Sequence, residues 1–168
     1  MLNFTVATSQ DAALLSQLGE ESYRHHFSAY WQEPAELEAF IHREYARPVI
    51  TQSLAGGDCW LIAAADRPVG FIKLSWSQSL PDSSASGAYL HKLYLLAQQT
   101  GQGWGQQMFA EACRQARERQ ECWLWLEVLA NNTGARRFYQ RQGMHEVGSC
   151  WFGSDSQRSE LIQMQMAL

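Results

Sequence analysis

Residues 93–108, which read LYLLAQQTGQGWGQQM, decide the fold of this chain. An apolar, strand-like run leads into a loop with glycines at alternate positions. A helical pattern begins at once, with apolar residues at three- and four-residue spacings on one face. Those residues are Trp104, Met108, Phe109, Ala112, Cys113 and Ala116. Alternate glycines let the backbone approach a ligand closely, and the first-turn amides of a helix attract an anion. The stretch therefore predicts a site for a phosphate or pyrophosphate.

Two familiar phosphate loops do not fit this stretch. A dinucleotide-binding loop, G-x-G-x-x-G, would need glycine at Gln106 or Met108. A nucleoside-triphosphate loop would need Gly-Lys-Ser/Thr at its end, which is absent. For the loop taken alone, a glycine-rich turn without a ligand remains the alternative.

A second motif lies further along the chain. Cys122–Val128 reads as a strand, and residues 131–144 read NNTGARRFYQRQGM. Asn132 suits the N-cap of a helix, and Gly143 suits its C-terminal stop. One face of this helix carries Ala135, Phe138, Tyr139 and Gln142. The motif predicts a strand followed by a short helix.

Together the two motifs resemble those of the GNAT superfamily of acetyl-CoA-dependent N-acetyltransferases. That family has a strand, a pyrophosphate loop Gln/Arg-x-x-Gly-x-Gly/Ala and a helix, then a strand and Asn-x-x-Ala-x-x-Phe-Tyr-x-x-x-Gly-Phe. The second element matches from Asn132 to Gly143, with Met144 in place of the usual Phe. The loop matches in two registers, starting at Gln98 or at Thr100. We prefer Thr100, which sets the glycines better against the helix start, although Thr replaces the usual Gln or Arg.

The resemblance covers about residues 55–168 and implies a GNAT-like α/β fold. This fold has a mixed, mostly antiparallel central sheet with splayed strands, flanked by helices. We expect one domain over residues 1–168, with helices after Thr8 and from Pro34 in addition to those of the two motifs. The expected strands are residues 4–6, 59–65, 69–76, 88–95, 122–128, 146–151 and 160–166.

Composition narrows the function classes. The net charge is −4 without a basic block, which argues against a nucleic-acid partner. No apolar run is long enough to span a membrane and no leader is recognisable, so we expect a cytoplasmic protein without a membrane partner. The four cysteines form no C-x-x-C pair and the five histidines lack ligand spacing. We therefore expect buried thiols and no metal site.

The resemblance also assigns the donor. It implies that acetyl-CoA is the acetyl-donor cosubstrate, held by the backbone of the strand before the loop, by the loop amides and by one asparagine. Carried over, the strand residues are Leu93, Tyr94 and Leu95. The loop residues are Thr100, Gly101, Gln102, Gly103, Trp104, Gly105 and Gln106, and the asparagine is Asn132.

Acetyl transfer to an amine needs a proton acceptor for the amine and a proton donor for the leaving thiolate. The resemblance makes Tyr139 the acid, since a phenol with a pKa of about 10 stays protonated at neutral pH. Some members place a glutamate base where this chain has Tyr89. His91, two residues on and on the same strand face, is one candidate base, as in aralkylamine-type members. Glu127 on the next strand is the rival, or a counter-charge for the amine, and the alternative of no base stays open.

The acceptor is expected to be a primary amine, because residues 26–31 with the helix from Pro34, and the tail 147–164, are similar to the bacterial polyamine acetyltransferase branch. A small polyamine-like substrate is the first expectation. A protein N-terminal or ribosomal-protein amine is the alternative, as is a non-catalytic acetyl-CoA-binding module. An aminoglycoside acetyltransferase is disfavoured because the N-terminal third offers only scattered carboxylates. The choice between a monomer and a homodimer is left open.

Overall fold

The computed structural model of the protein describes all 168 residues. The chain divides into two compact units. Unit 1 comprises Met1–Leu74 and Lys92–Met108, and unit 2 comprises Ser75–His91 and Phe109–Leu168. The single domain expected over residues 1–168 stays a prediction.

Seven strands form a mixed sheet with the order β1-β2-β3-β4-β5-β7-β6. They are β1 (Asn3–Val6), β2 (Cys59–Ala64), β3 (Pro68–Ser79), β4 (Ser86–Leu95), β5 (Trp123–Leu129), β6 (His145–Gly153) and β7 (Arg158–Ala167). β4 pairs with β5 in parallel, whereas β1 with β2, β2 with β3, β5 with β7 and β6 with β7 are antiparallel. The mixed, mostly antiparallel sheet predicted from the sequence is confirmed.

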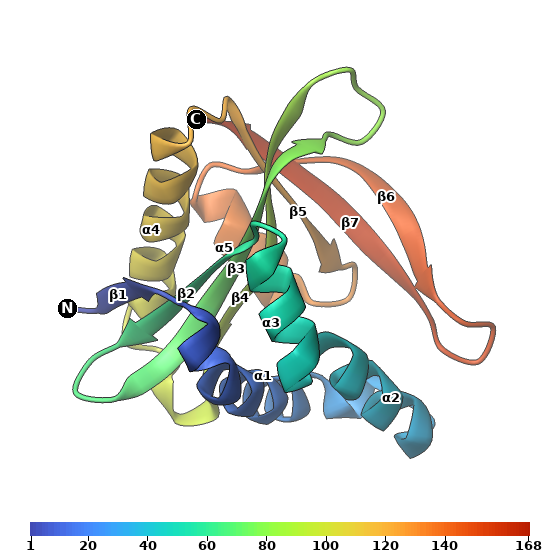
Figure 1. Ribbon diagram of the computed structural model, residues 1–168. Coiled ribbons are helices and arrows are strands. Elements are labelled where there is room, and N and C mark those ends of the chain that lie inside the picture. The colour runs from blue at the N-terminus through green and yellow to red at the C-terminus, as the bar shows by residue number, and fades with distance from the viewer. The chain divides into compact units, whose positions relative to one another are not determined.

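Five α-helices accompany the strands: α1 (Ala12–Phe27), α2 (Pro34–Tyr45), α3 (Arg47–Ala55), α4 (Trp104–Glu118) and α5 (Thr133–Arg141). In unit 1, α1, α2 and α3 pack against one another (Figure 1). The sequence analysis missed α3, because its nine residues include Pro48 and the β-branched Val49, Ile50 and Thr51, which weaken the helical signal. Two features of the packed chain sustain it: Pro48 lies in its first turn, and Ile50 is fully buried.

The expected capping box is present, since the Thr8 backbone N donates to Asp11 Oδ2 over 2.8 Å, and it caps a short 3-10 turn, Ser9–Asp11, that leads directly into α1. The helix also runs through the aromatic and histidine-rich stretch that interrupts its periodicity. Burial explains this persistence, because α1 contributes Leu15 and Leu18 to the core of unit 1. A Cβ at Gly19 would collide with the ring of Tyr45, so glycine there lets α2 approach α1 closely.

An ion pair of a buried lysine with a half-buried glutamate joins β4 to α2 within unit 1. Lys92 is 7% exposed, and its Nζ lies 3.5 Å from Glu44 Oε1 and 5.0 Å from the ring centroid of Tyr45. Burial lowers the pKa of Lys92, while the Glu44 carboxylate opposes that shift. Removing the Glu44 carboxylate would leave the buried Lys92 charge with little solvation.

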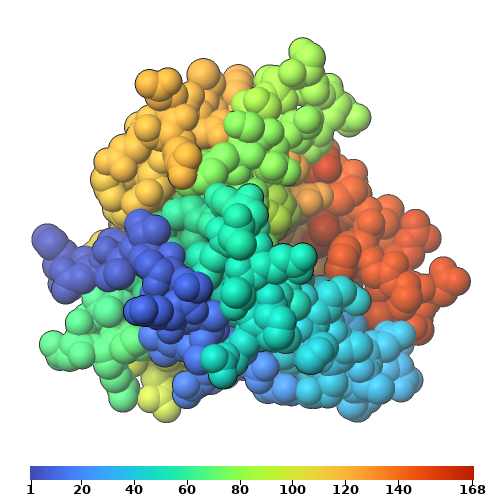
Figure 2. Space-filling view, in the orientation of Figure 1, coloured from blue at the N-terminus to red at the C-terminus, as the bar shows by residue number.

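In unit 2, the β6–β7 hairpin extends from the strand pair β5–β7 (Figure 1). One face of β5 buries Leu124, Leu126 and Val128, so Trp125 and Glu127 point to the opposite face. β6 is largely exposed, and its hairpin is the orange-red surface in Figure 2.

All four cysteines are free, as expected. Cys59 and Cys113 are buried, but Cys122 is exposed and Cys150 is half-buried, so the expectation of buried thiols is wrong for Cys122. None of the helices has the length and apolar character that crossing a bilayer requires.

Candidate active site

The predicted anion loop is open in the structure. Gly101 and Gly103 have φ values of +80° and +73°, which side chains other than glycine rarely adopt. A Cβ added at either position would meet no atom within 4 Å. Helix α4 begins at Trp104, so Gly105, which has no side chain, lies in its first turn. Loop and helix start therefore offer amides and open space, which is what an anion requires.

The end of β4 is fixed by β3 in unit 1. Leu96 N donates to Val69 O over 2.8 Å. A Cβ at Gly70 would collide with the Tyr94 carbonyl oxygen, so glycine permits this close strand approach. The Tyr94 ring packs 5.5 Å from that of Phe27, so its side chain belongs to the core rather than to an open surface.

The Leu95 carbonyl has a partner that the sequence did not reveal. His26 Nε2, on α1, lies 2.7 Å from Leu95 O, and because a carbonyl only accepts, the histidine nitrogen donates. The two residues are 69 positions apart, so no local motif could announce the contact. This carbonyl, expected to be available to the donor, is already hydrogen-bonded.

Tyr89 and His91 lie together in unit 2, as their spacing predicts. Their ring centroids are 4.2 Å apart, which confirms that both side chains share one face of β4. His91 Nε2 is 2.7 Å from the hydroxyl of Ser75, which is buried on β3. Ser75 thus orients the imidazole, and it was not among the predicted site residues.

Glu127 receives one neutral donor on each carboxylate oxygen. The Tyr89 hydroxyl donates to Oε1 over 3.0 Å, and the Cys150 thiol donates to Oε2 over 2.8 Å. Burial, with the Glu127 hydrogen bond and charge adding to it, raises the pKa of Cys150 to about 11. Cys150 therefore stays a thiol at neutral pH and serves as a donor, not as a nucleophile.

Tyr139 and Asn132 belong to α5 and its N-cap. Asn132 Oδ1 accepts from Ala135 N over 3.2 Å, so the predicted cap is confirmed. Tyr139 is half-buried, with its ring centroid 6.0 Å from that of Phe109 and 5.2 Å from that of Phe138. Burial raises the pKa of Tyr139 well above its ordinary value of about 10, so the hydroxyl stays protonated at neutral pH.

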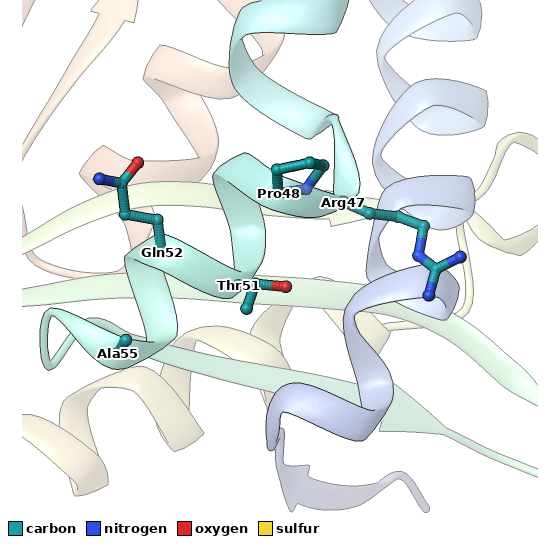
Figure 3. A pocket seen from close by; sticks show the side chains of 5 residues that line it. All are labelled: Arg47, Pro48, Thr51, Gln52 and Ala55. Carbon is teal, nitrogen blue, oxygen red and sulfur yellow. The ribbon is translucent and has the colours of Figure 1, made fainter.

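A surface pocket on α3 contains none of these residues. Figure 3 shows it lined by Arg47, Pro48, Thr51, Gln52 and Ala55. All five belong to one helix, and none is a predicted site residue. It brings no acid, base or nucleophile from a second element, so we assign it no part in the chemistry.

The family model described as Acetyltransferase (GNAT) family matches residues 20–144, which is more than half of the chain. The chain belongs to the GNAT acetyltransferase family. It is therefore an N-acetyltransferase, and acetyl-CoA is its acetyl donor. No curated protein matches the sequence.

Solved GNAT structures share this fold. Paia N-acetyltransferase from Thermoplasma acidophilum, in complex with coenzyme A, has a TM-score of 0.73 at 20% identity, covering 100% of this chain and 99% of that one. Ribosomal-protein-alanine N-acetyltransferase from Brucella melitensis has a TM-score of 0.72 at 21% identity, with 99% of each chain covered. The protein yncA from Salmonella typhimurium, with its cofactor acetyl-CoA, has a TM-score of 0.66 at 13% identity, covering 100% of this chain and 94% of that one.

The loop of this GNAT chain fits the pyrophosphate of acetyl-CoA. The space over Gly101 and Gly103 is open, and the amides there need no help from a particular side chain. The replacement of Gln or Arg by Thr100 therefore leaves the backbone donors intact.

Sequence reasoning missed three partners of the predicted residues, namely His26, Ser75 and Cys150. Each lies on a different element from the group it contacts. Pattern analysis along the chain carries no signal for such pairs, because strand and helix periodicity reports faces and not neighbours.

Proposed function

We propose that the protein transfers the acetyl group of acetyl-CoA to a primary amine of a small, polyamine-like molecule. The observation that carries this proposal is a half-buried aromatic cluster on α1, on α2 and on the segment between them, a region where glutamates outnumber arginines. A cationic acceptor is the ligand that such a surface favours.

The aromatic cluster comprises Tyr23, Phe27, Trp31 and Phe40, all half-buried. The Tyr23 ring centroid lies 4.8 Å from that of Phe27 and 4.9 Å from that of Phe40. Trp31 is 5.2 Å from Phe40, and its Nε1 donates to the Tyr23 hydroxyl over 3.1 Å. The rings are thus held in place and partly open to solvent, as cation–π binding requires.

The charged residues of this segment also favour a cationic acceptor. Residues 12–45 contain six glutamates and two arginines. Arg24 is paired with Glu38, and the Arg43 guanidinium lies 5.3 Å from the centroid of the Phe40 ring. The excess of carboxylates attracts amines and raises their local concentration.

The residues of unit 2 account for the proton transfers. A primary amine is neutral in only about one molecule in a thousand at pH 7.4, so a base or a favourable environment is needed. In our proposal, His91, oriented by Ser75, takes that proton. Tyr139 donates a hydrogen to the departing sulfur, and the amides of Gly101–Gln106 hold the donor. Acetyl-CoA, when bound, supplies the thioester whose carbonyl the amine attacks.

A protein amine is the second candidate acceptor. Val147, Trp151 and Phe152 of β6 are exposed, which would suit contact with a polypeptide. The Brucella melitensis structure, named as a ribosomal-protein-alanine N-acetyltransferase, is one of the similar solved structures.

A thiol-release assay with acetyl-CoA tests the proposal. The acceptors are butylamine, 1,4-diaminobutane, spermidine and a peptide that begins with alanine. We expect the highest kcat/KM for the diamine or the triamine. A higher kcat/KM for the peptide would move the function to protein amines, and no release above hydrolysis with any amine would indicate a binding module.

A further inference from the structure

Glu127 carries a charge without a cation beside it. Its two hydrogen bonds come from the neutral donors Tyr89 and Cys150. None of the ion pairs in the protein involves Glu127. Half-buried carboxylates are normally paired, because removing a charge from water is costly unless an opposite charge compensates it.

The two donors keep the carboxylate in one orientation. A carboxylate has about four acceptor positions, so the hydrogen bonds from Tyr89 and Cys150 leave further lone pairs for a ligand. The carboxylate thus has a fixed orientation and open acceptor positions for a cationic ligand.

Aromatic and amide side chains lie on the same face of the sheet as this carboxylate. Trp125 precedes Glu127 by two residues on the same face of β5, and its ring centroid lies 4.3 Å from that of Tyr89. Across the ladder, Trp125 pairs with Gln165 and Glu127 with Gln163, which places both glutamines on that face. A carboxylate, two ring systems and two amide oxygens are together the groups that bind an alkylammonium.

The bound ammonium cannot readily be the one that reacts. A carboxylate beside an ammonium stabilises its charged form and raises its pKa, whereas attack on the thioester needs the neutral amine. Glu127 is therefore suited to a cation that keeps its proton during the reaction.

We infer that Glu127, with Tyr89 and Trp125, binds a second, non-reacting ammonium group of the acceptor and so selects diamines over monoamines. This inference rests on the proposed function and specifies its substrate class.

The experiment compares butylamine with 1,4-diaminobutane, which differ in the second amino group. Glu127→Gln removes the charge at nearly constant volume, and Asp155→Asn, exposed in the β6–β7 turn of the same unit, is the matched control. Calorimetry of each amine in the presence of CoA gives Kd, and thiol release gives kcat and KM. We expect Glu127→Gln to raise Kd and KM for the diamine about 10- to 100-fold more than those for butylamine, and we expect the control variant to match the wild type.

The possible outcomes distinguish a failure of the Glu127 inference from a failure of the proposed acetyl transfer. If the wild-type protein acetylates both amines with similar KM, or if Glu127→Gln affects both equally, the proposed binding of a second ammonium group by Glu127 is wrong, while the proposed function stands. If no amine is acetylated but the diamine binds in a Glu127-dependent way, the binding of an ammonium group by Glu127 stands and the proposed function fails. An alanine peptide that binds better than the diamine overturns the substrate class.

Tyr89→Phe keeps the test valid should Glu127→Gln fail to fold. This variant keeps the ring and removes one of the two donors to Glu127. We expect a smaller rise in the diamine Kd, about 2- to 10-fold, and no change for butylamine. An unchanged diamine Kd in the folded variant would contradict a role for the Tyr89–Glu127 hydrogen bond.

Discussion

The loop at residues 100–106 and the cluster around Glu127 use different parts of the polypeptide. The loop works with backbone amides, two left-handed glycines and a helix start. The cluster works with side chains from three strands, namely Tyr89 on β4, Glu127 on β5 and Cys150 on β6. The loop lies within one continuous stretch of chain, whereas the cluster exists only after distant strands have paired.

In the proposed assignment, backbone groups hold the donor and side chains hold the acceptor, so the acceptor site can change while the donor site is kept. Backbone donors tolerate many side chains, provided that the glycine conformations remain. A side-chain cluster depends on every member, because a lost donor leaves a polar group without its partner. Substitutions in the two regions should therefore have different signatures, with donor binding lost in one case and acceptor chemistry altered in the other.

The largest effect is expected from Gly103→Glu. A side chain at φ +73° is strained, and its carboxylate would repel the pyrophosphate. Acetyl-CoA should raise the melting temperature of the wild-type protein and should no longer do so for the variant. Gly57→Glu is the control, since Gly57 also has a positive φ and open space around it. Undiminished acetyl-CoA affinity in folded Gly103→Glu would remove the loop from the donor site.

Tyr139→Phe should leave acetyl-CoA affinity nearly intact and lower kcat by about 100-fold, the scale of a positioned acid. Because the folded pKa of Tyr139 is raised, the unfolded chain loses this proton first as the pH rises above about 10. The wild-type protein should therefore lose stability at alkaline pH, and the variant should lose less. Turnover equal to wild type would exclude Tyr139 as the acid.

His91→Gln should lower kcat/KM by about 10-fold or more and abolish its rise with pH between about 6 and 7, where an imidazole loses its proton. Acetyl-CoA affinity should be kept. His145→Gln, an exposed histidine of the same unit, is the control. If Glu127→Gln abolishes the rise of kcat/KM with pH while His91→Gln retains it, the base is Glu127. If neither changes the profile, the amine enters already neutral and the enzyme acts by positioning.

The smallest effect is expected from Asn132→Ala. The variant loses the cap bond to Ala135 N, which costs about 1 kcal/mol, or about 2–4 °C in melting temperature. Asn131→Ala, its exposed neighbour, should change little. A larger loss of acetyl-CoA affinity than of stability would support the proposed contact of Asn132 with the donor.

The fold could be predicted from the sequence where local patterns were strong. The ends of α2, the cap at Asn132 and the stop at Gly143, whose φ is +102°, follow from the preferences of single residues. Helix α3 could not be predicted, because its β-branched residues weaken the helical signal and the burial of Ile50 that helps to sustain it is a tertiary contact. Within the candidate site, the loop and the shared face of Tyr89 and His91 were predictable, but the partners of His91 and Leu95 were not.

By itself, the sequence determined the glycine loop, the two strand–helix units and through them the family and its donor. These features depend on backbone conformation and on spacings of a few residues, which are properties of consecutive residues. Only the tertiary structure decided that Ser75 meets His91, that His26 holds the Leu95 carbonyl, and that Tyr89 and Cys150 both donate to Glu127. Such contacts join residues 16 to 69 positions apart, and strand register and helix packing set their distances.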